Sequence, residues 1–223
     1  MQLPARTSVM ILNTVLFPGA VLPLRIFEMR YRAMLSAALA GDRMFAIALQ
    51  RPGARSESPC PVACLGLIRA AVENPDGTSN LILQGVVRIR LAGIIHYKPF
   101  RQYRMELLAP DPKESLVVDA LRSRVLELAE ARARQGIPLP LDAFKKAVGE
   151  IDGPKTIDRF IESLAQWPDA GQLADLIARL FLQDNPRAQQ SVLEAIATER
   201  RLKQLVQILM GEVVSAQSKG QNP

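Results

Sequence analysis

Residues 15–28 read VLFPGAVLPLRIFE, and this stretch decides the fold of the first half of the chain. Pro18 and Gly19 have the composition of a tight turn, because proline presets φ and glycine tolerates a positive φ. Apolar residues then alternate with others over residues 20–26, which is the period of a β-strand. Proline cannot donate a hydrogen bond to a sheet, so Pro23 predicts that this strand lies at an edge or carries a bulge.

The hydrophobic period changes after this strand. Residues 27–38 repeat apolar side chains at helical spacing, and Gly41 is placed to end the helix. Further apolar runs predict strands over residues 45–50, 62–72, 80–93 and 96–108. The sequence PDG at 75–77 indicates a hairpin loop between two of them. One early helix among several strands predicts a small, partly closed β-barrel.

The second half of the chain has a helical period. Residues 109–113 read APDPK, and two prolines so close together indicate a linker. Amphipathic segments separated by Pro and Gly predict helices over residues 116–135, 141–148, 155–166, 172–182 and 187–214, followed by a frayed polar tail over 215–223. We therefore predict an α+β chain, with a β-rich domain over residues 1–110 and a compact helical bundle over residues 111–223.

The composition is that of a folded protein, since 48% of the 223 residues are hydrophobic. No apolar run approaches the ~18–20 residues that cross a bilayer, and the first residues lack a secretory signal pattern. We therefore expect a soluble, cytoplasmic protein with no membrane partner. Residues 1–110 carry 13 Lys and Arg against 6 Asp and Glu, a net charge of +7, whereas residues 111–223 carry 15 against 16, a net charge of −1. This basic excess suits an anionic partner or a solvated arginine-rich surface.

Side chains that perform catalysis or hold metals are scarce. His96 is the only histidine, and Cys60 and Cys64 lack the spacing of a zinc site. The sequence has no phosphate-binding GxxxxGK motif, no GxGxxG and no GxSxG. Aromatic and basic residues interleave from Tyr97 to Arg104, which is typical of surfaces that bind single strands, although a strand would divide them between two faces. We expect no catalytic residue, no cofactor and no metal.

Residues 12–35 read LNTVLFPGAVLPLRIFEMRYRAML, with an FPG turn, a proline-bearing strand and a helix in that order. This order resembles the start of the N-terminal, substrate-recognising domain of the Lon ATP-dependent proteases. Similar stretches follow in the family's order: GLI at 66–68, NPDGT at 74–78, LQGVVRIRL at 83–91, and the helical segments at 173–182 and 188–212. The resemblance implies a PUA-like β pseudo-barrel followed by a helical bundle. It does not reach the ATPase and Ser–Lys proteolytic units, and residues 27–31 favour a stand-alone, Lon-like protein.

The resemblance and the residues together predict a non-catalytic recognition module that binds unfolded or exposed protein segments. An edge strand held open by Pro23 offers backbone groups and apolar side chains to an extended peptide. The residues expected to line or shape this site are Pro18, Val21, Pro23, Arg25 and Phe27. A separate protease or chaperone is a further expected partner. The simpler interpretation is that the turn at Pro18 closes the barrel and Pro23 protects the edge from aggregation.

The alternative function is RNA binding, because PUA-like barrels occur in RNA-binding proteins and the first half of the chain is basic. Arg88 and Arg90 are two residues apart, so on a strand they share one face and could contact phosphates. A third interpretation is a small-molecule pocket or a hidden enzyme. It would need a concave site that holds titratable groups with perturbed pKa values.

Overall fold

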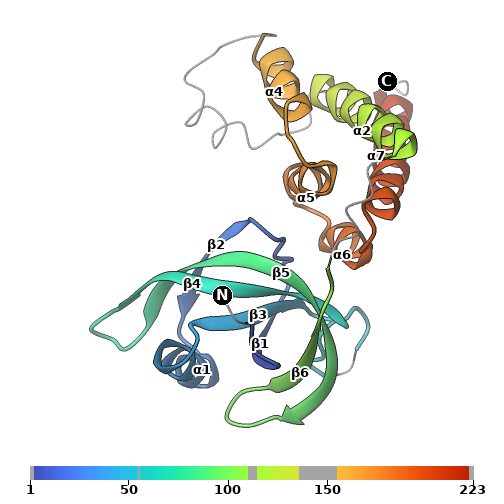
Figure 1. The fold of residues 1–223 in the computed structure, drawn as a ribbon. Coiled ribbons are helices and arrows are strands. Elements are labelled where there is room, and N and C mark those ends of the chain that lie inside the picture. Colours follow the sequence, from blue (N-terminus) through green and yellow to red (C-terminus); the bar gives the residue numbers. More distant parts are fainter. Residues whose placement is uncertain (1–2, 55, 110–114, 136–154, 221–223) are drawn as a thin grey trace. The chain divides into compact units, whose positions relative to one another are not determined.

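The computed structural model of the protein describes residues 3–54, 56–109, 115–135 and 155–220. The chain divides into two compact units, residues 1–109 and 110–223 (Figure 1). Strands and a single described helix make up the first unit, and the described elements of the second are all helices. The predicted α+β fold is confirmed. The helix expected over residues 141–148 lies outside the described residues.

The elements of the first unit follow the predicted order. They are β1 (Arg6–Leu12), β2 (Val21–Ile26), α1 (Met29–Ala40), β3 (Met44–Leu49), β4 (Val62–Glu73), β5 (Ser79–His96) and β6 (Gln102–Leu107). The strand expected over residues 96–108 is shorter than predicted, because β5 continues to His96 and a turn over residues 97–101 precedes β6.

The strands of the first unit form one mixed sheet that closes on itself (Figure 1). The strand order is β2-β5-β4-β3-β1-β6, and β5 also pairs with β6, so β1, β3, β4, β5 and β6 complete a ring. β1 and β3 are parallel, and the other paired strands are antiparallel. The long β5 is shared, because its first half pairs with β2 and its second half with β6.

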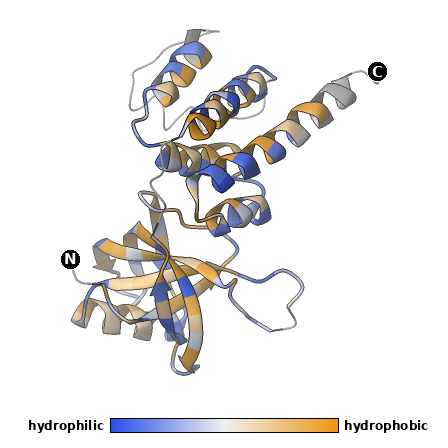
Figure 2. Cartoon of the chain, turned by 45° about the vertical axis from the view of Figure 1, so that its right-hand side comes forward, coloured by the Kyte–Doolittle hydropathy of each residue, from blue (hydrophilic) through white to orange (hydrophobic). Residues whose placement is uncertain are grey.

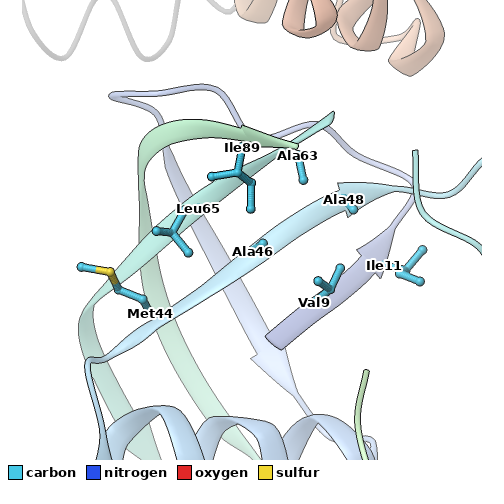
Figure 3. Close-up of a cluster of buried hydrophobic side chains, with 8 residues drawn as sticks. All are labelled: Val9, Ile11, Met44, Ala46, Ala48, Ala63, Leu65 and Ile89. Atoms are coloured by element: carbon cyan, nitrogen blue, oxygen red, sulfur yellow. The ribbon is translucent and has the colours of Figure 1, made fainter. Parts of the chain in front are cut away.

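The core of this barrel forms around β3. All six residues of β3 are buried, which explains why its sequence, MFAIAL, does not alternate. α1 packs against β3 and buries Tyr31, Met34, Leu35 and Ala38. Inside the barrel a cluster of buried side chains comes from four strands (Figure 3): Val9, Ile11, Met44, Ala46, Ala48, Ala63, Leu65 and Ile89. Several of these are alanines, whose small side chains allow neighbouring strands to fill a narrow interior at native density.

The FPG sequence forms a type II turn that is fixed to β5. Ala20 N donates to Phe17 O at 3.1 Å, and Gly19 has a φ of 77°, as the third position of this turn requires. Gly19 N donates to Gly85 O at 2.9 Å, and Gly85 N donates to Ala20 O at 2.8 Å, which is the pattern of a G1 β-bulge. A Cβ atom on Gly85 would lie 2.1 Å from Phe17 O. Glycine at 85 therefore permits the turn to lie against the strand.

The described part of the second unit consists of helices, three of which have a side-chain cap at their first turn. They are α2 (Leu116–Arg134), α4 (Lys155–Ala165), α5 (Ala170–Phe181), α6 (Pro186–Glu194) and α7 (Thr198–Gly220). Ser115, Asp169 and Asn185 accept hydrogen bonds from backbone N–H groups at the starts of α2, α5 and α6. α2 packs along α7, and the buried side chains include Val125, Ile177 and Leu205. No helix in the described residues is long and apolar enough to cross a membrane.

The prediction of one helix over residues 187–214 is wrong. α6 ends at Glu194 and α7 begins at Thr198, and the three residues between them are not helical. The guanidinium of Arg201 donates from Nε to Ala195 O at 3.1 Å and from Nη2 to Ile196 O at 2.9 Å. These bonds satisfy carbonyl groups at the break, so the helix can turn without proline or glycine. The expected frayed tail is also too long, because α7 continues to Gly220.

Candidate functional site

β2 is an edge strand, as its proline predicts. It pairs with β5, and no other strand of the described residues pairs with it. Gly85 N donates to Ala20 O, so Ala20 and every second residue after it direct their backbone groups toward β5. By the same alternation, Val21, Pro23 and Arg25 direct theirs toward the open edge. Pro23 therefore lies where a missing N–H costs no hydrogen bond of the sheet, and the predicted edge position is confirmed.

The outward face of this edge is apolar. Across β2 and β5, Pro23 lies opposite Ile82, and across β5 and β4, Ile82 lies opposite Ala70. Residues directly opposite one another share a face of the sheet. Val21 is 56% exposed, Val72 63% and Ile82 37%. Three strands thus present neighbouring apolar side chains to solvent. Figure 2 shows that hydrophobic residues occur along the strands of this unit.

This face is hollowed into a shallow depression of about 480 Å³. Its lining includes Pro23 and Arg25 from β2, Ala70 and Val72 from β4, and Ile82 from β5. The depression is open and mainly apolar, which suits a segment of aliphatic or aromatic side chains better than a small polar ligand. We call the surface formed by Val21, Pro23, Ala70, Val72 and Ile82, together with the open edge of β2, the β2 face.

A polar group flanks the β2 face. Arg25 Nη2 lies 3.6 Å from Asp76 Oδ2, and both side chains are exposed. Asp76 Oδ1 accepts hydrogen bonds from Thr78 Oγ1 at 2.6 Å and from Thr78 N at 2.9 Å. These hydrogen bonds hold the pKa of the Asp76 carboxyl below its usual value. Arg25 therefore faces a carboxylate at neutral pH, and an exposed pair of this kind contributes little to stability.

The structure brings three of the five predicted site residues together. Val21, Pro23 and Arg25 share the outward face of β2, because they alternate along the strand. Pro18 is half-buried in the turn that lies against Gly85, so it shapes the start of the strand. Phe27 is exposed just beyond the end of β2 and does not line the depression.

The two arginines expected to contact phosphates differ in exposure. Arg88 is 5% exposed, whereas Arg90 is exposed on the same strand, β5. Only Arg90 therefore offers its guanidinium to solvent, and the pair does not form the exposed basic strip that its spacing suggested.

Sequence reasoning missed the contribution of β4 and β5 to the β2 face. The signal was present in Leu81-Ile82-Leu83, because three consecutive apolar residues on a strand must place one on the other face. Leu81 and Leu83 are buried, and Ile82 is the residue that faces outward. The partner of Ile82 across the sheet, Pro23, depends on the strand register, which no local pattern gives. Among the described residues, no group of three His, Cys, Asp or Glu side chains could hold a metal ion.

The first unit is thus a closed barrel with a flanking edge strand, and the described elements of the second unit are helices. Residues 7–211 match the family model of the ATP-dependent protease La (Lon) substrate-binding domain, and the protein belongs to this family. The expected resemblance is confirmed over nearly the whole sequence.

Similar proteins include several Lon proteases. The sequence is 28% identical over 207 residues to Lon protease 2 of Herpetosiphon aurantiacus, covering 91% of this chain and 23% of that protein. It is 30% identical over 219 residues to the Lon protease of Trichlorobacter lovleyi, covering 94% of this chain and 24% of that protein. The 223 residues thus span about a quarter of the length of these relatives.

Two solved structures have the same fold. The N-terminal domain of a Mycobacterium avium complex Lon protease superimposes with a TM-score of 0.66 at 17% identity, covering 92% of this chain and 98% of that one. A Lon N-terminal domain protein from Xanthomonas campestris gives a TM-score of 0.58 at 18% identity, covering 91% and 97% of the two chains. The match to known proteins therefore lies within the substrate-binding domain.

Proposed function

We propose that the protein is a non-catalytic recognition module that captures exposed or unfolded protein segments at the β2 face. The observation that carries this proposal is an edge strand with an open hydrogen-bonding side, beside exposed apolar side chains from three strands. The family model supports it, because the matching domain is the one that binds substrates in Lon proteases.

The captured segment would extend the sheet as a further strand. Val21 and Arg25 supply an N–H and a C=O each at the open edge, and Pro23 supplies a C=O alone. Main-chain pairing of this kind does not depend on the side chains of the segment. A module that acts on many damaged proteins needs such tolerance of sequence.

Apolar side chains of the segment would then cover Ile82, Val72 and Val21. Each large apolar side chain removed from water contributes about 1.5–3 kcal/mol before the ordering of the segment is subtracted. A disordered segment loses conformational freedom when it pairs, so the expected binding is weak and reversible. Handing the segment to a separate protease or chaperone, our proposed partner, requires release of this kind.

The proposal is tested with the protein of residues 1–223 and a reduced, carboxymethylated model protein that cannot refold. Ile82→Asp places a charge in the centre of the β2 face, and we expect it to weaken binding about tenfold. Leu116→Asp is the matched control, because Leu116 is 88% exposed at the start of α2 in the second unit. Equal binding by the wild type and Ile82→Asp would contradict the proposal.

RNA binding is the alternative function, and an experiment on the same protein distinguishes it from peptide capture. Burial of Arg88 leaves a weaker basic surface than the spacing of Arg88 and Arg90 suggested. The affinity for mixed RNA is measured at increasing salt concentrations. If RNA binding involves several phosphate contacts, this affinity should fall steeply as the salt concentration rises. Salt-sensitive RNA binding that Ile82→Asp leaves unchanged would favour the alternative.

A further inference from the structure

A second concave site lies in the first unit, and its volume is about 720 Å³. Its lining includes Arg30 and Tyr31 from α1 and Tyr97, Lys98, Phe100 and Arg101 from the turn between β5 and β6. The aromatic and basic residues that interleave over residues 97–101 of the sequence thus line this pocket. None of these residues lines the depression on the β2 face.

Two of the cations in this pocket are already fixed by one carboxylate. Arg30 Nη1 donates to Glu57 Oε2 at 2.5 Å, and Arg101 Nη1 donates to the same oxygen. Arg101 Nη2 also donates to Glu57 O at 2.9 Å. Burial raises the pKa of the Glu57 carboxyl, but the hydrogen bonds from both arginines outweigh it, so the pKa lies below its usual value. The two guanidinium groups are therefore held in place.

The charges around the pocket leave one cation in excess. Arg30 also pairs with Glu28, its Nη2 lying 2.8 Å from Glu28 Oε2. Arg30, Lys98 and Arg101 thus face two carboxylates, those of Glu28 and Glu57, which gives a local net charge of +1. Lys98 is exposed and makes no ion pair with any described residue. One monovalent anion would balance this charge.

Aromatic residues line the same pocket as that cation. Tyr97 is 65% exposed, and Phe100 packs edge-on against His96 with ring centroids 5.9 Å apart. The guanidinium of Arg30 lies over the ring of Tyr31, 4.4 Å from its centre. A pocket lined by aromatic residues and one unbalanced cation suits a ligand that joins an aromatic or aliphatic side chain to a single negative charge.

We propose that this pocket binds a carboxylate that neighbours a large apolar side chain in a protein segment, with Lys98 as the ion-pair partner and Tyr97 as the apolar contact. The carboxylate comes either from an internal Asp or Glu or from the free C-terminus of a polypeptide. The inference rests on the proposed function, since it names a chemical preference among captured segments, but it concerns a separate set of residues. It would favour segments in which an acid lies next to an aromatic residue.

A nucleic acid fits the same pocket less well. A single strand needs a track of cations along its phosphates, whereas Arg30 and Arg101 are bound to carboxylates and Lys98 alone is unbalanced. Tyr31 is 6% exposed and its ring is already covered by Arg30, so it offers no stacking surface.

The test uses three fluorescein-labelled hexapeptides and the protein of residues 1–223. One ends in phenylalanine with a free carboxylate, one is its C-terminal amide, and one is that amide with glutamate placed before the phenylalanine. We expect at least one of the two acidic peptides to bind more tightly than the neutral amide. Lys98→Ala should remove most of that difference, about three- to fivefold, while Lys98→Arg retains it. Arg90→Ala, which removes an exposed cation outside the pocket, is the control and should change nothing.

The two acidic peptides distinguish the sources of the carboxylate, because a site for polypeptide ends binds the first and a site for side chains binds the third. Equal binding of all three peptides overturns the proposal, and so does an acid preference that survives Lys98→Ala. Tighter, salt-sensitive binding of an oligouridine that competes with the peptides would assign the pocket to RNA instead. Ile82→Asp separates the two sites, since it should leave the acid preference intact even if capture at the β2 face fails.

Discussion

Arg201 Nη1 lies 3.2 Å from Asp175 Oδ1, and both side chains are buried in the second unit. Arg201 also donates to the carbonyl oxygens of Gly171, Ala195 and Ile196. One guanidinium thus joins α5 to the break between α6 and α7. A buried charge satisfied so fully becomes costly when any partner is lost.

Removing this guanidinium should destabilise the second unit strongly. We expect Arg201→Ala to lower its free energy of unfolding by about 3–5 kcal/mol, since Asp175 and three carbonyl groups lose their donor. Urea unfolding followed by fluorescence of Trp167, the only tryptophan, reports on this unit. Lys203→Ala breaks an exposed pair with Glu199 and should cost less than about 1 kcal/mol. If the two variants lose similar free energies of unfolding, the buried contacts of Arg201 do not stabilise the second unit as we propose.

Because the FPG turn lies close against β5, we expect any side chain at position 85 to destabilise the first unit. Gly85→Ala would place a Cβ atom 2.1 Å from Phe17 O, and we expect a loss of about 1–3 kcal/mol as the turn is displaced. Gly93→Ala is the control on the same strand, because its Cβ would meet nothing closer than 3.6 Å. The midpoints of thermal unfolding of the two variants are compared by far-ultraviolet circular dichroism. Equal midpoints would mean that the turn does not depend on this contact.

The Glu57 carboxylate should make the first unit sensitive to acid. Its pKa is lowered in the folded protein, so its stabilisation is complete at neutral pH and is lost as pH falls from the usual value of about 4.5 through the folded value. Glu57→Gln should cost about 1 kcal/mol at pH 7 and progressively less in this acidic range. Urea unfolding between pH 7 and pH 3 measures the difference. A cost that stays constant with pH would show that ionisation of Glu57 does not matter.

We propose that Pro23 limits both edge-to-edge aggregation and the pairing of a captured segment, and one substitution can separate these two effects. Pro23→Val supplies an N–H at the open edge, so we expect greater self-association and two- to tenfold tighter binding of an unfolded protein, about 0.5–1.5 kcal/mol. Light scattering and fluorescence anisotropy measure the two effects. Pro75→Val, at an exposed position in the hairpin loop, is the control. Greater self-association with unchanged binding would leave protection from aggregation as the only role of Pro23.

The parts of the fold that local chemistry determines could be predicted from the sequence. Pro18 was enough to place a turn. Pro23, together with the alternation of apolar residues over residues 20–26, was enough to place an edge strand. Helical spacing and the Pro and Gly breaks likewise indicated most helices of the second unit. The break before α7 was not predicted, because the side chain that satisfies its carbonyl groups, Arg201, lies several residues further along the sequence.

The candidate sites were predictable only in part, because each is assembled across the sheet. Val21 and Pro23 could be identified from their own strand, whereas Ile82 and Val72 join them through the register of β5 and β4. Glu57 lies 44 residues before Arg101 in the sequence, so no spacing rule links them. Arg88 is buried although it lies on the face of β5 opposite Ile89 of the barrel interior, and spacing along one strand could not indicate this.

Amide hydrogen exchange at the open edge of β2 tests the central claim most directly. Exchange is measured by NMR on the isotopically labelled protein, with and without a reduced, carboxymethylated protein. We predict that the amides of Val21 and Arg25 become protected on binding, while those of Leu22 and Leu24, which face β5, change little. Binding that leaves Val21 and Arg25 exchanging at their original rates would contradict capture by strand addition at this edge.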